Sequence, residues 1–331
     1  MSIRIAAMGR SVGRCRPIQD AAIFDTANEE NIRLLKLDGF IEFVESDQPV
    51  GVMACEAIRS CLKASSCLAD RIGAVILTTE SFWDVADDPR TLGEPEDHLR
   101  FRDDLLGAVF ENRLVRSEIY ANWLMGCANA FSSIVLARAL IESGRHQRVL
   151  AVIADRVRPG KSRLLNSNVA FCSDIALACL ITDATLERSG YLINHLVSHS
   201  YLPAVAFGGK EEIYSRVHEL LTELSVFKEK VERITRRRLS DYKMIIADNL
   251  SSEYFRFICH CLAIDVELVQ FPSKAALGHS SGADCLLSLD VIEKSGQSRP
   301  EQPMAVLNFG LSAFYFMEVE SGAPEAEAGS E

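Results

Sequence analysis

Residues 116–144 read RSEIYANWLMGCANAFSSIVLARALIESG, and this stretch decides how the rest of the chain is interpreted. Its first part, 118–124, has the β-branched and aromatic content of a short buried strand. Its last part, 128–143, is apolar on nearly every side, which is typical of a helix inside a core. Cys127 stands between them, on a sharp turn at a helix N-terminus, where unpaired amides and the helix dipole favour thiolate over thiol. The stretch therefore predicts a strand–turn–helix elbow that carries a nucleophilic cysteine.

The other cysteines favour a simpler interpretation, because free thiols usually pack as small hydrophobic groups. The chain has 10 cysteines in 331 residues, too few for a disulfide scaffold, and Cys55, Cys179 and Cys285 lie inside apolar runs. We therefore expect reduced, buried thiols in a reducing compartment. Cys127 differs from them by its position on the elbow.

The length, composition and net charge of the chain exclude some classes of function. A chain of 331 residues can form one large domain or two fused halves, and 48% hydrophobic with 24% charged residues is ordinary for a globular enzyme. The net charge of −11 disfavours nucleic acid as a partner, since such binding neutralises phosphates. The N-terminus lacks the apolar segment of a secretory signal, and no run approaches the ~18 apolar residues of a membrane span. We expect a cytoplasmic protein that uses neither nucleic acid nor membrane.

The pattern of elements predicts a mixed α/β fold with a faint internal duplication. In each half, a strand leads to a turn with a reactive type of residue, then to a buried helix and two further strands, which predicts two α/β halves stacked in layers. The predicted strands are 3–8, 72–79, 149–154, 174–181, 243–247, 304–309 and 313–319; the predicted helices are 50–67, 210–239, 251–262 and 283–294. Residues 82–104 are expected to be an exposed acidic insertion, and the acidic, small-residue segment 321–331 a disordered tail.

The sequence resembles the thiolase fold and, within it, β-ketoacyl-acyl-carrier-protein synthase III. The similarity covers most of the chain and is weakest at 84–115 and 186–240. Four motifs carry it, in the family's order: Gly126-Cys127-Ala128-Asn129-Ala130-Phe131, Ser173-Asp174-Ile175-Ala176, Gly278-His279-Ser280-Ser281 and Phe309-Gly310-Leu311-Ser312. The resemblance implies a layered α-β-α-β-α core. Residues 1–185 would form the half that carries the nucleophile, and 186–320 the half that carries the other two loops. It also implies a homodimer.

Two positions depart from the family pattern. Where the family has a histidine at the end of a second-half strand, this chain has Asp248; where the family has an asparagine in the later loop, it has His279. Decarboxylative condensation needs neutral hydrogen-bond donors aimed at a forming enolate. An ionised Asp248 would provide no donor and would place a like charge beside the enolate at a cost of several kcal/mol. The exchange therefore argues against the family's usual reaction.

The same residues suit acyl transfer. Cys127 would take an acyl group from an acyl-CoA or acyl-carrier-protein thioester, His279 would move the proton, and Asp248 would hold the imidazole in the right tautomer. The resemblance places the oxyanion hole at the amides of Cys127 and of Gly310 or Leu311. The acyl group would then pass to an alcohol, an amine or another acceptor, in specialised metabolism rather than in fatty-acid synthesis.

Two alternatives remain open. Glu80 falls where the related hydroxymethylglutaryl-CoA synthases carry a catalytic glutamate. Cys127, His279 and Glu80 could therefore instead form a carbon–carbon bond in a Claisen-type condensation. Against this, a glutamate just past a strand is often only a solvated loop residue. The chain could also be a non-catalytic subunit of a ketosynthase heterodimer, against which the retention of Cys127 weighs.

Substrate contacts are less well marked. Arg236, Arg237, Arg238 and Arg256 are candidates for binding the donor's phosphates, with Asn249 as a further substrate contact, although a basic run is commonly a solvated helix face. The acidic protein does not favour an equally acidic carrier protein unless a local basic patch offsets its charge.

No cofactor is expected, because the thioester is itself the substrate and no glycine-rich dinucleotide loop is present. No metal site is expected either. Cys259-His260-Cys261 has the residue types of metal ligands, but neighbouring positions on a helix point apart.

Overall fold

The computed structural model describes the chain apart from residues 1, 23–24, 26–27, 66, 82–94, 123–125, 166–167, 202–210, 298–301, 311 and 323–331. It describes the backbone alone at 95–101 and 211–218. Most of the predicted acidic insertion, Leu311 and most of the predicted tail therefore lie outside the described residues.

One ten-stranded mixed sheet runs through the molecule in the order β12-β11-β13-β14-β10-β1-β9-β6-β4-β5. The first part of the chain supplies β1 (Ile3–Val12), β4 (Ala74–Thr78), β5 (Glu118–Ala121), β6 (Arg148–Asp155) and β9 (Ile175–Asp183). The second part supplies β10 (Tyr191–Ser200), β11 (Ile245–Ala247), β12 (Val269–Gln270), β13 (Met304–Phe309) and β14 (Ala313–Ser321). The two groups are joined where β1 pairs antiparallel with β10, at Ile3 and Ile193.

The two groups of strands have the same topology. In the first, β4 lies parallel between β5 and β6, and β9 is antiparallel to both β6 and β1. In the second, β11 lies parallel between β12 and β13, and β14 is antiparallel to both β13 and β10. This repeated order confirms the predicted duplication. The chain passes from one group to the other between Asp183 and Tyr191; a domain boundary at 185/186 stays a prediction.

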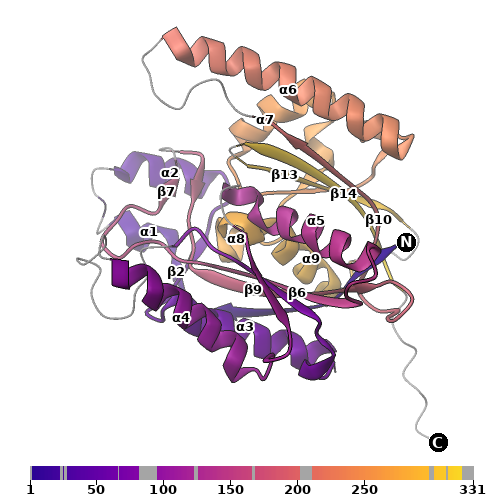
Figure 1. The fold of residues 1–331 in the computed structure, drawn as a ribbon. Helices are drawn as coiled ribbons and strands as arrows, with labels where there is room; N and C mark the ends of the chain where they lie inside the picture. The colour runs from indigo at the N-terminus through magenta and orange to yellow at the C-terminus, as the bar shows by residue number, and fades with distance from the viewer. Residues whose placement is uncertain are drawn as a thin grey trace, which may run out of the picture.

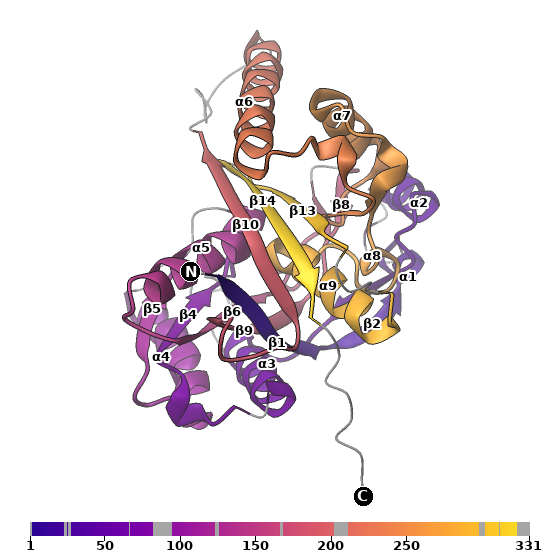
Figure 2. The same ribbon diagram turned by 90° about the vertical axis from the view of Figure 1, so that its right-hand side faces the viewer.

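Helices and strands alternate in five layers (Figure 1, Figure 2). Helices α5 (Asn129–Glu142) and α9 (Asp284–Ser295) share one core cluster with the inward faces of both groups of strands. Helix α3 (Val50–Ser65) packs with α4 (Pro95–Glu111) on the outer face of the first group, and α6 (Glu211–Thr235) with α7 (Ser252–Leu262) on that of the second. The α-β-α-β-α arrangement is the predicted one.

Shorter elements complete the chain. They are β2 (Arg14–Pro17), α1 (Ile18–Ala22), α2 (Glu29–Leu37), β3 (Glu42–Glu45), β7 (Leu164–Leu165), β8 (Ala170–Phe171) and α8 (Lys274–Leu277). Few elements were predicted between residues 10 and 50, where β2 and β3 form a separate two-stranded antiparallel sheet.

Two expectations about secondary structure were wrong. The strand predicted as buried at 118–124 is β5, which ends at Ala121 and is half-exposed at the edge of the sheet. The chain from Pro95 to residue 104, predicted as part of an exposed insertion, begins helix α4. Proline is favoured at the first helical position, where its missing N–H costs nothing. The helix continues to Glu111 and buries Leu105, Ala108 and Val109 against α3. The acidic residues at its start led to the prediction of an exposed segment, although the apolar residues that face α3 follow directly.

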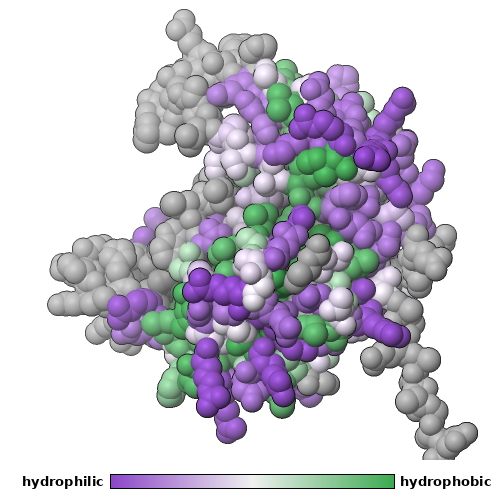
Figure 3. Space-filling view, turned by 45° about the vertical axis from the view of Figure 1, so that its right-hand side comes forward, coloured by the Kyte–Doolittle hydropathy of each residue, from purple (hydrophilic) through white to green (hydrophobic). Residues whose placement is uncertain are grey.

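The surface suits an acidic globular protein. On the face drawn in Figure 3, hydrophilic side chains surround scattered hydrophobic ones. Among the described residues, no helix combines the length and apolar content needed to cross a lipid bilayer.

Candidate active site

Cys127 occupies the predicted elbow. A short 3₁₀ turn, Gly126–Ala128, leads into α5, and Gly126 has a φ of +58°, a conformation that glycine adopts without strain. The carbonyl of Cys127 accepts a hydrogen bond of 2.9 Å from Asn308 Nδ2 at the end of β13. The nucleophile is therefore held from the second half of the chain as well as from its own helix.

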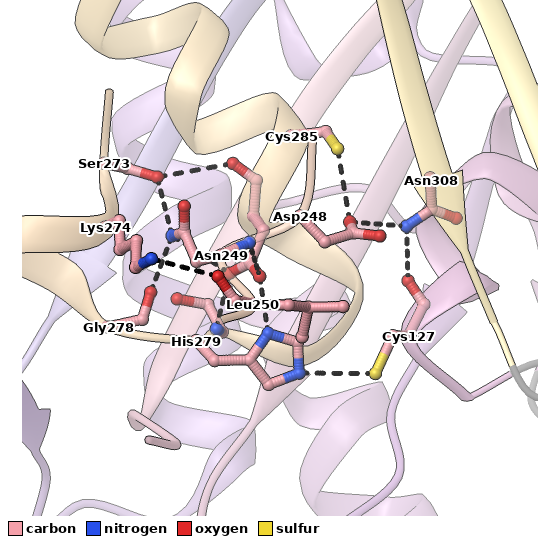
Figure 4. Close-up of polar contacts among 12 residues, drawn as sticks. Cys127, Asp248, Asn249, Leu250, Ser273, Lys274, Gly278, His279, Cys285 and Asn308 are labelled. Atoms are coloured by element: carbon pink, nitrogen blue, oxygen red, sulfur yellow. Dashed lines mark hydrogen bonds and ion pairs between the residues drawn. The ribbon is translucent and has the colours of Figure 1, made fainter. Parts of the chain in front are cut away.

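His279 reaches the same place from the second half. Its Nε2 lies 3.3 Å from Cys127 Sγ (Figure 4). The backbone on either side is fixed like a strand, since His279 N–H donates to Phe171 O at 2.8 Å and Ser173 N–H to His279 O at 2.7 Å. A side chain at Gly278 would meet Phe171 O at 2.8 Å, and φ there is +61°, so the approach of this loop requires glycine. The imidazole itself is 1% exposed.

The carboxylate that orients the imidazole is Asp284, which the sequence interpretation missed. Asp284 Oδ2 lies 2.5 Å from His279 Nδ1. Asp284 is held in turn by the amides of Asn249 at 2.8 Å and Ser280 at 2.6 Å. Because it begins α9, five residues after the histidine, its side chain can turn back onto the loop. A histidine followed five residues later by an aspartate at a helix start was the available signal.

Asp248 therefore does not have the role that was predicted for it. It is fully buried directly after β11, and its carboxylate accepts hydrogen bonds from Asn308 Nδ2 and from Phe309 N–H, both at 2.8 Å (Figure 4). Cys285 Sγ donates to it at 3.2 Å. These contacts face β13 and α9, whereas His279 Nδ1 faces Asp284.

Burial and the neighbouring charges shift the pKa values of both groups of this pair. Burial raises the pKa of the Cys127 thiol above its ordinary value, with His279 opposing this and Asp248 and Asp284 adding to it. Desolvation therefore outweighs the preference for thiolate that was expected at the helix terminus. Burial also disfavours the imidazolium of His279, but contact with Asp284 outweighs it and raises the pKa of His279 well above its usual value. Asp284 thus stabilises the imidazolium that forms when His279 takes the thiol proton.

Glu80 is close to this pair. It follows β4, and its Oε1 accepts a hydrogen bond of 3.1 Å from Asn129 Nδ2, two residues after the nucleophile. Glu80 as a whole is exposed, but partial burial of its carboxyl group raises the pKa, opposed by Asn129, an amide of Gly126 and the charge of His279. Its own amide donates to Asp155 Oδ1 at 2.6 Å. A second acid–base group therefore stands on the Glu80 side of the elbow.

Two predicted contacts have other partners. The Gly310 amide donates to Ala313 O at 2.9 Å, so it is not available to an oxyanion, because the β13–β14 turn uses it. Asn249 is fully buried and its side-chain amide donates to Gly278 O at 2.6 Å and Ser273 Oγ at 2.9 Å. It fixes the histidine loop and is not exposed to a substrate. The oxyanion role of the Cys127 amide stays a prediction, and Leu311 lies outside the described residues.

The predicted arginines lie on the surface. Arg236, Arg237 and Arg238 are exposed and come before the amino end of β11, whereas Asp248 and the site lie at its carboxyl end. Arg256 is exposed on α7. The position of the triplet argues against contact with a donor at Cys127, and the role of Arg256 stays a prediction.

A basic pocket that was not predicted from the sequence lies beside Phe171, which contacts the backbone of His279. A cavity of about 380 Å³ has Arg16, Arg158, Lys161 and Arg163 in its lining, together with Asp25, Glu45 and Phe171. Arg163 is fixed by two hydrogen bonds to Asp174, of 3.0 and 2.9 Å. The carbonyl of Phe171 accepts the His279 amide, so the pocket wall and the base are adjacent. The Arg-Pro-Gly-Lys-Ser-Arg run after β6 was the available signal.

The structure was compared with those of known proteins. Solved structures match along nearly the whole chain. ChlB3, described as an acyltransferase, has a TM-score of 0.75 at 18% identity, covering 98% of this chain and 99% of that one. 3-Oxoacyl-(acyl carrier protein) synthase III, FabH, from Pseudomonas aeruginosa has a TM-score of 0.72 at 14% identity, covering 98% and 100%. The chain has the thiolase fold. Cerulenin-bound OleA from Xanthomonas campestris also matches, with a TM-score of 0.72 at 13% identity, covering 97% and 99%.

These comparisons confirm the predicted fold class and the resemblance to synthase III at the level of structure. No family model matches the sequence, and the search of curated proteins gives no significant match. Among the residues that the structure describes, no three or more His, Cys, Asp and Glu side chains are grouped to hold a metal ion. All ten cysteines are unpaired.

Proposed function

We propose that this protein is an acyltransferase that loads an acyl group from a thioester onto Cys127 and passes it to an oxygen or nitrogen nucleophile. The observation that carries the proposal is the chain of contacts from Cys127 Sγ to His279 Nε2 at 3.3 Å and from His279 Nδ1 to Asp284 Oδ2 at 2.5 Å. A sulfur, an imidazole and a buried carboxylate in that order form a catalytic triad with cysteine as nucleophile.

The reaction follows from these contacts. Cys127 Sγ gives its proton to His279 Nε2 and attacks the thioester carbonyl; the donor's C–S bond breaks, and the departing thiolate takes the proton from the imidazolium. In the second half-reaction, His279 takes the proton of the acceptor hydroxyl or amine as it attacks the acyl-enzyme. Cys127 leaves and recovers that proton. Asp284 stabilises the imidazolium in both halves.

The donor would be an acyl-CoA or an acyl-carrier-protein thioester. The pocket beside Phe171 supports this, because its lining includes three arginines and a lysine, of which Arg163 is held by Asp174 and Arg16 by Glu45. Basic side chains of this kind bind phosphate groups. It is also the local basic region that an acidic carrier protein would require on a chain of net charge −11. This pocket replaces Arg236, Arg237 and Arg238 as the proposed phosphate contact.

Two further observations bear on the type of reaction. The description of ChlB3 as an acyltransferase supports the proposal. Asp248 places a second buried carboxyl group near Cys127, and Asp248 contributes to raising the thiol's pKa. When Asp248 is ionised, its carboxylate opposes an enolate for the same reason, which disfavours decarboxylative condensation.

Carbon–carbon bond formation is the second candidate, and Glu80 is the observation that favours it. Its carboxyl group is bonded to Asn129 on the nucleophile's helix and feels the charge of His279, as a base acting on a second substrate would require. A non-catalytic subunit is disfavoured by the intact contacts of Cys127, His279 and Asp284.

Incubation with a panel of acyl-CoAs and acyl-carrier proteins, followed by intact-protein mass measurement, tests the proposal. We expect the mass to rise by one acyl group in the wild type and in the control Cys261→Ala, whose thiol lies on α7, and to stay unchanged in Cys127→Ala. Acylation of Cys127→Ala at the wild-type rate would contradict the proposal. An ester or amide product supports acyl transfer, and a ketone product supports the Glu80 alternative.

We further propose a cytoplasmic homodimer that acts in specialised metabolism. The resemblance to synthase III and the altered loops at Asp248 and His279 support this setting. Sedimentation analysis tests the dimer; a monomer at micromolar concentration would contradict it.

A further inference from the structure

The contacts of Asp248 connect it to the nucleophile. One Asp248 oxygen accepts from Asn308 Nδ2 and the other from Phe309 N–H, so the carboxylate holds two successive residues at the carboxyl end of β13. All of this is buried, since Asp248 and Asn308 are both 0% exposed. The end of β13 is therefore fixed by a carboxylate on the neighbouring strand β11.

Asn308 extends the connection to Cys127. The same Nδ2 that donates to Asp248 Oδ1 at 2.8 Å donates to Cys127 O at 2.9 Å (Figure 4). The two protons of one amide are thus divided between the carboxylate and the nucleophile's backbone. Asp248 sets the position and orientation of this amide, and the amide holds the peptide group that joins Cys127 to α5.

We propose that Asp248, acting through Asn308, is a positioning residue for the nucleophile Cys127, while Asp284 alone orients the imidazole. The inference rests on the proposed acyl transfer, because it names the groups that hold the same sulfur in place. Two buried carboxylates that look interchangeable in the sequence then have separate tasks, one on each reacting group.

The chemistry of the contact explains why a carboxylate stands here. An aspartate can accept from Asn308 Nδ2 and Phe309 N–H at once, one with each oxygen. An asparagine has a single oxygen, so its NH₂ would face one of these two donors. The structure thus separates Asp248→Asn, which loses one clamp contact, from Asn308→Ala, which removes the link to Cys127 itself.

Single-turnover acylation tests the inference. In Asp248→Asn and in Asn308→Ala, we expect the rate constant at saturating thioester to fall about 10²-fold, the effect of an ångström-scale misplacement. The thioester concentration that gives half the maximal rate should not change, because donor-binding residues are untouched. Asp290→Asn is the matched control: it is a buried aspartate of α9 that bonds Lys294 instead, and it should keep the wild-type rate constant.

Two double variants identify the route. If Asp248 acts through Asn308, the variant Asp248→Asn/Asn308→Ala is no slower than Asn308→Ala. Combining Asp248→Asn with Asp284→Asn should multiply the two losses, since the carboxylates serve different groups. Multiplying losses for Asp248 and Asn308, or an unchanged rate in Asp248→Asn, would overturn the inference. So would a fall that appears as a change of half-saturating concentration alone.

A crystal structure of Asn308→Ala gives a readout that needs no substrate. We expect the Cys127 carbonyl to move and the distance from Cys127 Sγ to His279 Nε2 to lengthen from 3.3 Å. Wild-type positions for both atoms would overturn the positioning role. If no thioester acylates the wild type, the proposed function fails, and this structure still decides the inference about Asp248 and Asn308.

Discussion

The two halves of the chain use one topology for different chemical groups. In the first, Cys127 follows β5 and precedes α5; in the second, His279 follows β12 and the short α8 and precedes α9. Glu80 follows β4 and Asp248 follows the equivalent strand, β11. The turns Gly126–Ala128 and Ser281–Ala283 contact each other. A duplicated fold thus brings two elbows together, one with the nucleophile and one with its base.

The halves differ in the direction of a buried carboxylate clamp. In the first, Asp155 at the end of β6 accepts the amide of Glu80, which follows β4. In the second, Asp248 after β11 accepts the amide of Phe309 at the end of β13. Burial raises the pKa of both aspartates to about 7. Both clamps join the carboxyl ends of equivalent parallel strands. That of Asp248 continues through Asn308 to the carbonyl of Cys127, whereas that of Asp155 holds Glu80, whose carboxyl group accepts from Asn129.

Of the variants that test the separate roles of the two halves, Asp284→Asn should slow acylation of Cys127 the most. Without the carboxylate, the pKa of His279 falls and the imidazole becomes a weaker base, so acylation of Cys127 should slow by about 10²–10⁴-fold. Single-turnover acylation across pH measures this, and the pH dependence of the rate should shift with the pKa of His279. A rate within a few-fold of wild type would show that the second half does not supply the base through Asp284.

Gly282→Ala tests the contact between the two elbows. A β-carbon there would lie 3.2 Å from Ala130 N and 3.4 Å from Cys127 O, so the second-half turn must move away from the nucleophile. We expect a loss of roughly 1–3 kcal/mol in the free energy of unfolding, measured by denaturant titration, with slower acylation. Gly107→Ala in α4 is the control, because nothing lies within 4 Å of its added carbon. Equal effects of the two changes would contradict close packing at the elbows.

The variant Asp155→Asn tests whether the first-half clamp makes the stability of the protein depend on pH. Because the pKa of buried Asp155 is about 7, the folded chain holds a proton that the unfolded chain releases near pH ~3.9. Its contribution to stability is therefore present at low pH and is lost as pH rises from about 4 to about 7. The asparagine keeps an acceptor for Glu80 N–H but does not titrate.

Unfolding free energies at pH 5 and pH 8 check this. Between these two pH values the wild type minus Asp155→Asn difference should fall by up to about 3 kcal/mol. The exposed Asp47→Asn should show no such change. A difference between wild type and Asp155→Asn that is constant with pH would mean that Asp155 titrates as an ordinary carboxylate.

Glu80→Gln should have the smallest effect. Glutamine keeps an oxygen for Asn129 Nδ2, and acyl transfer through His279 does not use the carboxylate, so acylation should stay within a few-fold of wild type. A large loss in product formation with normal acylation would favour the carbon–carbon condensation, because it would place the first-half carboxylate in the second chemical step.

The sequence predicted the elements with strong periodicity and the two reactive residues. The strands β6 and β13 and the helix α5 can be recognised from the apolar residues of their own segments. Cys127 and His279 each follow a glycine at a turn. Their contact was expected because the family fold brings these two loops together.

The partners of those residues could not be predicted in the same way. Asp248 and Asp284 are both buried aspartates, and only the direction of each side chain decides which one meets His279 Nδ1. Asn308 looks like any polar residue ending a strand until its amide is placed against Cys127 O. The basic pocket joins Arg16 with residues 158–163, and no local pattern connects such distant positions.

The sulfur and its base are 152 residues apart in the chain. Closing a contact of such separation is entropically costly and comes late. On the ribosome, therefore, the thiol of Cys127 is made long before any imidazole can reach it, and the aspartate that supports that imidazole emerges later still, at position 284. A nascent or misassembled chain would have an ordinary cysteine, and reactivity toward thioesters would report that the last strands have docked.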